Sequence, residues 1–394
     1  MNVKEIVDKL FMMIDLSFVG DEYYNCKIPK EYNINIMEEK YKDNLCELKP
    51  YYFSNNEEDV GNLLYIPDGD IIFPEIDYRE IEGSIRAYGI EEIAWYRSFH
   101  WNPAEKWGIY ILDKGLYYIA KNVFGRANQI DNFDKRYNTL DLLQKSFRLL
   151  FLHEFFHFIT DIASMTIEIV SYQSSKKYFG NYKNYINNVY MRPRNNSEPI
   201  EEALANAYTF NRFKTREDKE QIRSFMKNQP RGYSAFEKYI KKSDFTTGLQ
   251  ELGSYITTGN YRNILPALEI LFDCYKIYIS FSDVSVYIVN TINEPKYILK
   301  CVRRIPKETL AQSSEFLKDF QALPEKIKRK FEKVISKLDR DISIRSLKFE
   351  KLRANDTIFS VRIDSKYRFT LKPKNGEWIL LRIGEHDDIY RRPV

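Results

Sequence analysis

The most constraining feature of the sequence is an apolar stretch, Leu149 to Ala163, that carries titratable side chains inside it. Apolar residues fill nearly every face of a helix drawn over this stretch, which is typical of a helix buried on most sides. The same stretch contains His153, Glu154, His157 and Asp161. A lipid-facing helix would not tolerate these side chains, and the chain has no run of about 18 uncharged apolar residues, so we expect no membrane span. In a protein core, such groups are costly unless each one finds a partner.

The spacing of the two histidines indicates a metal site. His153 and His157 are four residues apart, so in a helix their imidazoles lie on one face and can take two positions around a tetrahedral zinc ion. Glu154 is rotated by one residue, so it cannot bind the same ion but can reach a metal-activated water as general base. The alternative is a helix whose histidines are satisfied by hydrogen bonds alone. The chain has only four histidines, and two of them fall in this motif.

A catalytic zinc normally has three protein ligands and an open position for water. The other histidines lie in separate segments, so a carboxylate is the expected third ligand. Glu168, eleven residues after His157, can serve if the first helix ends in time. Glu201 and Glu202 lie on a second helix, expected from about Pro199 to Phe213. Two histidines and a carboxylate also suit iron or manganese.

With these motifs, the region from about Trp95 to Phe213 resembles the gluzincin branch of the HExxH zinc metallopeptidases, the zincins. In that branch a downstream helix carries Glu-x-x-x-Asp, in which the glutamate binds the metal and the aspartate orients a ligand histidine. Glu202 and Asn206 match this spacing, so the resemblance implies Glu202 as the third zinc ligand and Asn206 as the residue behind a histidine. Asparagine departs from the pattern, because it can accept a histidine N–H but adds no negative charge.

The resemblance also implies how a substrate binds. In such enzymes an edge strand upstream of the zinc helix holds the peptide by strand addition. Trp107 to Leu112 reads as a strand and is the candidate for this role, the alternative being a plain core strand. The implied reaction is hydrolysis of a peptide bond, in a peptide or protein substrate, by a metal-activated water with Glu154 as general base.

From about Ser313 the sequence pattern changes to that of a small α+β unit. It predicts two helices and three strands: Ser314–Ala322, Pro324–Leu338, Thr357–Ile363, Lys366–Leu371 and Glu377–Ile383. From Phe316 to Val394 there are 20 Lys and Arg against 12 Asp and Glu, a net charge of +8, whereas residues 1–315 carry −4. This asymmetry suggests a basic module that approaches a polyanion, or else a solvated helix face.

The segment from about Phe316 to Tyr390 resembles the RelE/ParE superfamily of bacterial toxins. After the two helices, the features that carry this resemblance are Leu347–Leu352, Phe359–Ile363, Tyr367–Phe369 and Gly384–Tyr390. In the ribonuclease members, Lys, Arg and Tyr side chains on the sheet bind the RNA backbone and assist attack by a 2′-hydroxyl. The positions that the resemblance implies for RNA binding or nuclease chemistry are Lys348, Lys351, Arg362, Arg368, Arg382, His386 and Tyr390. The alternative is that Arg362 and Arg368 pair with nearby aspartates and hold the sheet together.

We therefore expect an α+β protein. Residues 1–300 would form a mostly helical zincin-like domain with a small mixed sheet and an active-site core at about 95–213, and residues 310–394 a RelE-like domain with two helices on an antiparallel sheet. The four cysteines are scattered and form no CxxC motif, which is typical of the reducing cytoplasm.

Three functions compete at this stage. The leading one is a zinc metallopeptidase whose C-terminal module docks on RNA, a ribosome or a partner protein, an antitoxin-like protein among them. The second is a toxin–antitoxin-type, RelE-like endoribonuclease (an mRNA interferase) regulated by the metal-binding domain. The third is an interaction scaffold with a structural zinc.

Overall fold

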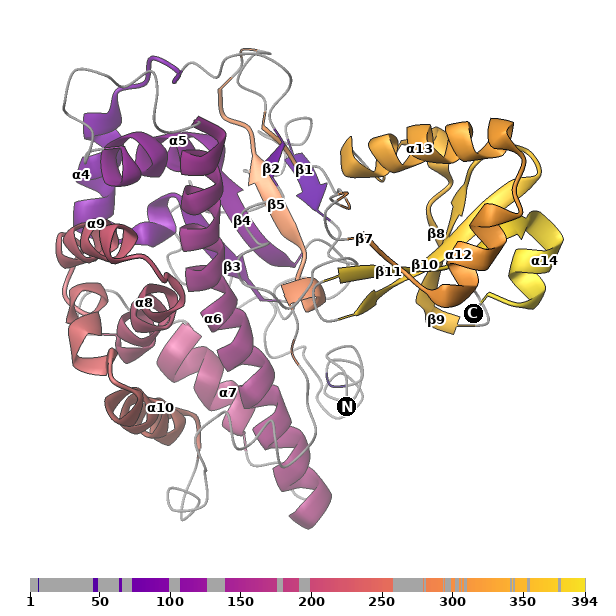
Figure 1. Cartoon of the computed structure of the whole chain (residues 1–394). Helices are drawn as coiled ribbons and strands as arrows, with labels where there is room; N and C mark the ends of the chain where they lie inside the picture. The colour runs from indigo at the N-terminus through magenta and orange to yellow at the C-terminus, as the bar shows by residue number, and fades with distance from the viewer. Residues whose placement is uncertain are drawn as a thin grey trace. The chain divides into compact units, whose positions relative to one another are not determined.

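The structure, a computed structural model, describes residues 6, 45–48, 64–65, 73–98, 107–125, 139–175, 180–190, 199–257, 279, 281–292, 294, 299–301, 305, 307, 310–340, 342, 344–352, 355–374 and 377–393. The chain is α+β, which confirms the predicted fold class. It divides into two compact units (Figure 1), one formed by residues 1–50 and 66–299 and the other by residues 51–65 and 300–394. Among the described helices, none combines the length and the apolar composition needed to cross a membrane.

The N-terminal unit contains a mixed four-stranded sheet. In order across the sheet, its strands are β1 (Leu45–Leu48), β5 (Val286–Val289), β4 (Gly108–Leu112) and β3 (Ala94–Arg97). β4 pairs parallel with β5 and antiparallel with β3, and all five of its residues are buried. The predicted strand Trp107 to Leu112 is therefore a core strand rather than an edge strand, since a strand that is paired on both sides cannot add a peptide.

Helices make up most of the rest of this unit. The longer ones are α4 (Tyr78–Tyr88), α5 (Asp113–Ile119), α6 (Thr139–Ser175), α7 (Asn181–Tyr185), α8 (Ile200–Arg212), α9 (Arg216–Lys227) and α10 (Lys242–Ile256). Short helical turns lie between them: η4 (Ile90–Glu92), η5 (Ala120–Phe124), η7 (Ile186–Tyr190), η8 (Tyr233–Tyr239) and η10 (Phe281–Asp283).

Helix α6 is the central element of the unit. It runs for 37 residues and packs against β3 and β4 as well as against α8 (Figure 1). Phe147, Phe151 and Phe155 stack along it, with successive ring centroids 6.0 and 5.4 Å apart. Four of its buried hydroxyl groups donate to the carbonyl four residues earlier in the helix; these are Ser146, Thr160, Ser164 and Thr166.

The C-terminal unit is built on a five-stranded sheet. Across this sheet the strands are β7 (Leu310–Gln312), β11 (Glu377–Glu385), β10 (Tyr367–Lys374), β9 (Asn355–Arg362) and β8 (Glu350–Leu352). β7 lies parallel to β11, and the other pairs are antiparallel. A short antiparallel pair, β2 (Leu64–Tyr65) with β6 (Lys300–Cys301), belongs to the same unit.

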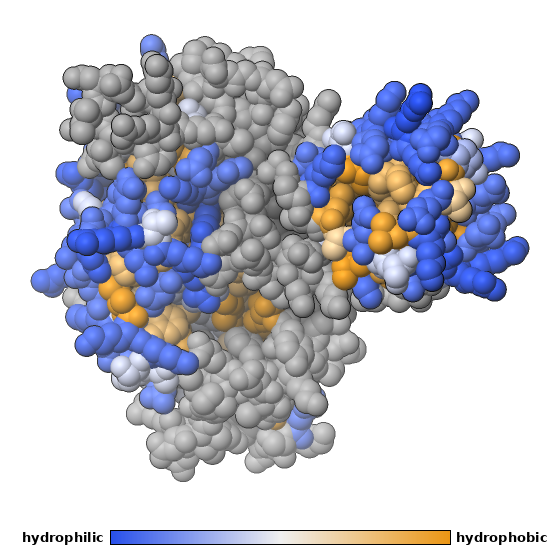
Figure 2. Space-filling view, in the orientation of Figure 1, coloured by the Kyte–Doolittle hydropathy of each residue, from blue (hydrophilic) through white to orange (hydrophobic). Residues whose placement is uncertain are grey.

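Two helices, α12 (Ser314–Gln321) and α13 (Glu325–Arg340), share a core with this sheet. Phe331 of α13 lies between Phe316 of α12 and Phe369 of β10, with ring centroids 5.6 and 5.2 Å away. A third helix, α14 (His386–Arg391), contacts β10 and β11. In the view of Figure 2, hydrophilic side chains surround the described surface of this unit, and hydrophobic side chains gather over its middle.

Candidate metal centre

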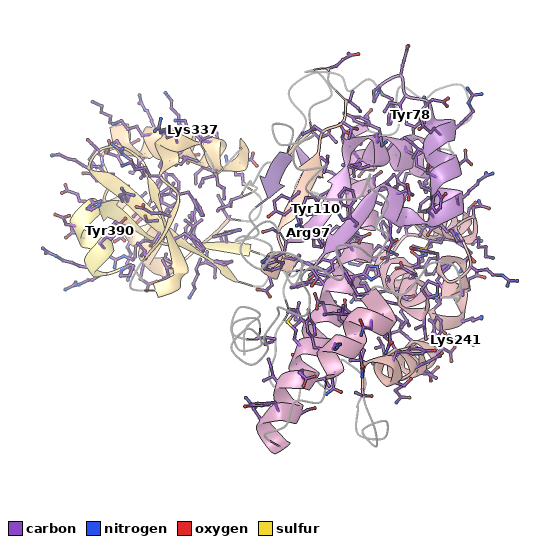
Figure 3. The ribbon with its side chains drawn as sticks, turned by 180° about the vertical axis from the view of Figure 1, so that it is seen from behind. Tyr78, Arg97, Tyr110, Lys241, Lys337 and Tyr390 are labelled. Carbon is purple, nitrogen blue, oxygen red and sulfur yellow. The ribbon has the colours of Figure 1, made fainter. Side chains whose placement is uncertain are left out.

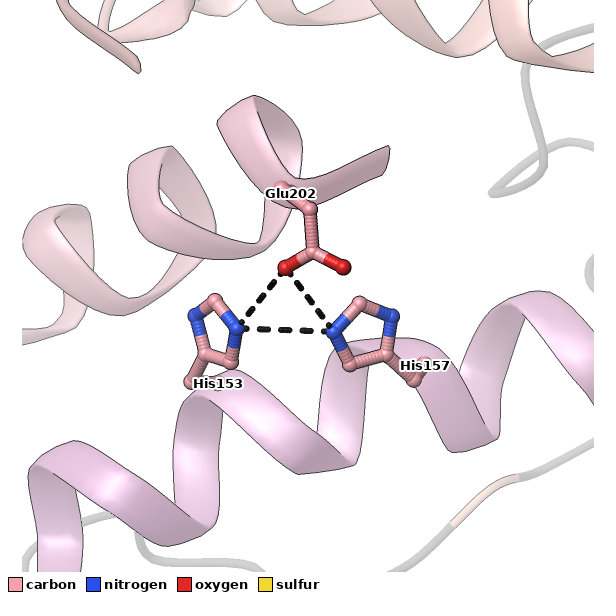
Figure 4. Close-up of side chains that lie close together, drawn as sticks. All are labelled: His153, His157 and Glu202. Carbon is pink, nitrogen blue, oxygen red and sulfur yellow. Dashed lines mark hydrogen bonds and ion pairs between the residues drawn. The ribbon is translucent and has the colours of Figure 1, made fainter. Parts of the chain in front are cut away.

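Three side chains from two helices converge on one point (Figure 4). His153 and His157 project from α6, and Glu202 projects from the first turn of α8. The Nε2 atoms of the histidines are 3.4 Å apart, and Oε2 of Glu202 lies 3.2 Å from the first and 3.5 Å from the second. A tetrahedral ion with bonds of about 2.0–2.1 Å needs ligand atoms about 3.3 Å apart, so this triangle has the size of one face of a zinc site. The three side chains form a buried group that could hold a metal ion.

The charges in the site suit a cation. Burial lowers the pKa of His153, and Glu202 only partly offsets this effect. Burial alone would also lower the pKa of His157, but the carboxylates of Glu202 and Glu201 outweigh it and hold that pKa well above its usual value. Burial would raise the pKa of Glu202, yet the two histidines keep it well below the usual value. The carboxylate is thus ionised and held by positive charge, and a bound metal ion would supply that charge in place of the His157 proton.

Other residues contact the ring nitrogens of the two histidines that face away from the common point. His153 Nδ1 lies 2.9 Å from Oδ1 of Asn206, four residues after Glu202 on α8. The Asn206 amide in turn donates to the backbone carbonyl of Tyr233 at 3.0 Å. Nδ1 of His157 lies 3.3 Å from Oε1 of Glu201. Asn206 thus orients the His153 ring by a hydrogen bond, whereas Glu201 Oε1 lies within ion-pair distance of His157 without one. Nε2 of both rings is directed at the common point.

Glu168, Glu201 and Glu202 are the three carboxylates that the sequence offers as the third metal ligand, and the structure places them differently. Glu202 lies in the group, and Glu201 contacts the outer nitrogen of His157 instead. Glu168 is remote, because α6 continues to Ser175 and eleven residues of helix span about 16 Å. Its carboxylate accepts the backbone N–H of Tyr182 at 3.1 Å.

Glu154, the predicted general base, belongs to α6, and its carboxyl group accepts a hydrogen bond from the backbone of Tyr96 on strand β3. It is buried, and burial raises its pKa well above the usual value, while His157 and a hydrogen bond from the Tyr96 backbone act in the opposite direction. Its Oε1 has no hydrogen-bond partner among the described residues. A buried carboxylate oxygen without a partner is costly, and it is available to a water or a substrate group.

A polar cluster that sequence reasoning missed lies one helical turn beyond His157. Asp161 accepts hydrogen bonds from Ser98 Oγ at 2.5 Å and from the hydroxyls of Tyr96 and Tyr182 at 3.0 Å each. Burial raises the pKa of Asp161 to about 7, although these hydrogen bonds lower it. The signal in the sequence was Asp161 itself, an acid in an apolar helix four residues after a ligand.

The predicted RNA-binding residues do not all lie together. Arg382 pairs with Asp319 of α12 at 2.6 Å, and Arg362 donates to the backbone carbonyl of Asp364. Lys348 is exposed after a 3-10 turn, at a left-handed φ of 42°, and Lys351 lies on β8. Arg362, Arg382 and Lys348 form no joint site in the described part of the chain.

The other three do gather, together with two residues that sequence reasoning missed. Arg368 donates to Glu350 Oε1 at 3.2 Å, and the hydroxyl of Tyr390 donates to the same oxygen at 2.8 Å. Ser360 lies 3.3 Å from that hydroxyl, and the ring of His386 stacks on Tyr390 with centroids 4.5 Å apart. We call these five residues the Glu350 cluster. Tyr390 lies on α14 in the C-terminal unit, whereas Arg97 and Tyr110, which are also labelled in Figure 3, belong to the N-terminal unit.

Comparison with known proteins leaves the family of the chain open. No protein-family model and no curated protein matches it. Among solved structures, the crystal structure of the RelB-RelE antitoxin-toxin complex from Methanococcus jannaschii contains a similar chain, at 17% identity. The match covers 20% of this chain and 94% of that chain, with a TM-score of 0.18. The function is therefore argued from the residues described above.

Proposed function

We propose that the chain is a zinc-dependent metallopeptidase whose metal ligands are His153, His157 and Glu202. The observation that supports this most directly is the triangle of ligand atoms, 3.2–3.5 Å apart, beside a buried glutamate with an unpartnered oxygen. A bound zinc ion would polarise the substrate carbonyl and lower the pKa of a water molecule. Glu154 takes a proton from that water and gives a proton to the leaving amine, for which its raised pKa is suited.

Metal content tests the ligand set. Purified wild-type protein should hold about one zinc ion per chain. Glu202→Ala should lose the ion, because it removes one corner of the triangle. Glu168→Ala is the matched control, since it also removes a buried glutamate of this unit but should retain the ion. A Glu202→Ala protein that binds zinc as tightly as wild type would exclude the proposed ligand set.

Proteolysis tests the role of Glu154. Glu154→Gln keeps the size and polarity of the side chain but cannot accept a proton, so it should retain zinc and lose about 10²–10⁴-fold in cleavage rate. Fluorescein-labelled casein, an unfolded and unselective substrate, is the probe. Equal rates for Glu154→Gln and wild type would rule out the general base.

The Glu350 cluster supports a second candidate function, cleavage of RNA by the C-terminal unit. The side chains of Glu350 and His386 are about half exposed, so a polymeric substrate can reach both, while Arg368 is buried beside them. Glu350 would take the proton of a 2′-hydroxyl as its oxygen attacks phosphorus, and His386 would protonate the departing 5′-oxygen. Arg368 would balance the charge that develops on the phosphate.

Single-stranded RNA with a 5′ label tests this candidate. The full chain should cut it in the presence of a chelator, and Glu350→Gln and His386→Gln should both abolish the cut. Arg382→Gln is the control, since Arg382 is held by Asp319 away from the cluster. If the full chain leaves the RNA intact, the unit is better tested as a docking module for RNA, a ribosome or an antitoxin-like protein, as the resemblance in sequence suggests.

A further inference from the structure

Helix α13 carries a row of positive side chains along its outer side. At about 100° per residue, a helix places five of its basic residues within about 100° of one another. These residues, which we call the α13 stripe, are Lys326, Arg329, Lys330, Lys333 and Lys337. Lys330 is partly exposed and the other four are exposed, whereas the apolar residues of α13 pack in the core of the C-terminal unit. Hydrophilic side chains line α13 in Figure 2, and Lys337 is labelled in Figure 3.

Most of this charge is not neutralised within the protein. Lys330 pairs with Asp364 at 2.6 Å. Lys337 donates to the Ser346 hydroxyl at 3.1 Å, which carries no charge. In the part of the chain that the structure describes, the other three side chains of the stripe have no ion pair. Four positive charges therefore remain on the stripe.

The arrangement of these charges weakens the helix by itself. Like charges four residues apart on a helix repel each other. The stripe holds three such pairs, Lys326 with Lys330, Arg329 with Lys333 and Lys333 with Lys337. Two acidic residues of α13 pair with lysines outside the stripe instead, Glu325 with Lys328 at 3.0 Å and Glu332 with Lys307 at 4.0 Å. A surface built only for solubility would mix the two signs, so the stripe suits an anionic partner.

We propose that the α13 stripe binds the phosphate backbone of double-stranded DNA, an interaction beyond the peptidase function. From Lys326 to Lys337 the helix rises about 16 Å, so its five positive side chains follow one another every 3–4 Å or so. Each strand of a DNA duplex carries one phosphate per about 3.4 Å of the helix axis. The row of cations on α13 thus has about the charge density of one DNA strand.

The chemistry of the stripe favours duplex DNA over other nucleic acids. Proteins that bind single strands combine cations with aromatic rings on which the bases stack, and the stripe contains no aromatic residue. The major groove of B-form DNA is wide enough for an α-helix, whereas that of A-form RNA is too narrow. Lysine meets a phosphate as a point charge and lacks the planar fork with which arginine reads guanine, so we expect little sequence preference.

The stripe is separate from the Glu350 cluster. Helix α13 shares a core with Phe359 and Phe369 on one face of the sheet. Ser360 and Arg368 are their neighbours in the strands, and successive side chains of a strand point to opposite faces. DNA also lacks the 2′-hydroxyl that the proposed RNA cleavage requires. Binding of DNA to the stripe is therefore distinct from substrate binding at the cluster.

Fluorescence anisotropy of a labelled DNA duplex of about 20 base pairs and mixed sequence, titrated with the full-length chain, tests the inference. The logarithm of the association constant should fall with the logarithm of the KCl concentration with a slope of about −3.6, which is about 0.9 for each of four charges. Replacing two residues in one protein, Lys326→Gln and Lys333→Gln, should weaken binding by about tenfold or more at about 100 mM KCl. The slope should become shallower by about two.

A second double variant, Lys238→Gln with Lys241→Gln, is the matched control. It removes two exposed lysines of the N-terminal unit and has the same net charge as the stripe variant, so its dissociation constant should stay within about twofold of wild type.

Three results would overturn the inference. The first is wild-type protein that does not bind the duplex at about 50 mM KCl, and the second is a stripe variant that binds no more weakly than the control variant. The third is tighter binding of a single strand of the same sequence, or of duplex RNA, than of duplex DNA. Each result leaves the proposed peptidase standing, because α13 carries none of the three candidate metal ligands.

Discussion

Asn206 stands where the gluzincin pattern has an aspartate, and its contacts explain the difference. Its carbonyl oxygen faces His153 Nδ1, while its amide N–H groups point at the Tyr233 carbonyl and, at 3.4 Å, at Gln229. An aspartate could meet the histidine but has no hydrogen to donate to the fixed backbone carbonyl of Tyr233. The site therefore needs a side chain that accepts on one side and donates on the other.

Asn206→Asp should accordingly destabilise the protein, even though aspartate is the residue of the gluzincin pattern that this region resembles. A buried carboxylate oxygen against a carbonyl oxygen should cost about 1–3 kcal/mol in the free energy of unfolding. Urea unfolding of the metal-free protein measures this cost without any contribution from zinc. If Asn206→Asp has the same free energy of unfolding as wild type, the amide hydrogens of Asn206 contribute nothing to stability.

Asp161 should make the stability of the N-terminal unit depend on pH. Because burial raises its pKa to about 7, the folded protein keeps a proton that the unfolded chain releases near pH 4. The free energy of unfolding should therefore decrease as pH rises from about 4 to about 7, by at most about 4 kcal/mol, and level off above that. Asp161→Asn removes this term, so its stability relative to wild type should increase across the same interval. Urea unfolding at several pH values, with both proteins metal-free, checks this, and parallel curves would contradict it.

The spacing of residues in the sequence was enough to predict only part of the candidate metal site. His153, Glu154 and His157 could be found because one helix carries all three. Glu202 and Asn206 could be found only through the resemblance to the gluzincin pattern, since nothing local in the sequence relates α8 to α6. Asp161 could be seen as an anomaly, but its partners Ser98 and Tyr182 come from separate segments and are brought in by tertiary packing.

At the scale of elements, the start of α8 depends on a glycine. Gly232 has a φ of +93°, a conformation that side chains with a Cβ rarely adopt, and an added Cβ would lie 2.4 Å from Cδ of Pro199. Pro199 is the N-cap of α8, whose first turn carries Glu202. The glycine thus lets η8 approach the helix that positions a metal ligand.

Gly232→Ala should therefore weaken zinc binding as well as stability. We expect a loss of at least about 1–2 kcal/mol in the free energy of unfolding from the backbone conformation alone. Zinc affinity should fall by about tenfold or more as the first turn of α8 is displaced. Gly83→Ala is the control, since Gly83 lies in α4 with nothing within 4 Å of an added Cβ, and it should stabilise by about 0.5–1 kcal/mol. Competition with a chromophoric chelator measures the affinity, and equal values for the two variants would refute the prediction.

Helices and strands that have a clear periodic pattern and turn residues at their ends could be predicted from the sequence. Strands whose place depends on pairing with distant segments could not. The C-terminal helices and the strands β9 to β11 begin and end within three residues of their predicted bounds, because period and turn residues mark them. β3 and β7 were missed, since four- and three-residue strands carry little pattern of their own. The role of β4 was left open because pairing on both sides depends on β5, which lies far along the chain.

At the scale of the whole molecule, the two units should unfold separately. Each has its own buried core, and the three residues that could hold a metal ion all lie in the N-terminal unit. Zinc at about 100 times its dissociation constant should stabilise that unit by about 2.7 kcal/mol and leave the other unchanged. Calorimetry should show two unfolding transitions. A chelator should lower the midpoint temperature of the transition that belongs to the N-terminal unit and leave the other unchanged.

The variant Leu380→Ala shows which of the two unfolding transitions belongs to the C-terminal unit. Leu380 is 1% exposed in the core of the C-terminal unit, and its truncation should cost about 2–5 kcal/mol there. The substitution should lower the midpoint temperature of the transition that the chelator does not change. A single transition that responds to both treatments would show that the units unfold together.

The pairing of β2 with β6 has a consequence for how the chain is made. A ribosome synthesises Leu64 and Tyr65 before residues 66–299 of the N-terminal unit, yet their partners, Lys300 and Cys301, emerge only after those residues. The C-terminal unit is thus not a simple appendage joined end to end, and a fragment that starts at residue 310 leaves both strands of this pair behind. Co-translational folding would complete the N-terminal unit first, while Leu64 and Tyr65 of the C-terminal unit stay unpaired until Lys300 and Cys301 are synthesised.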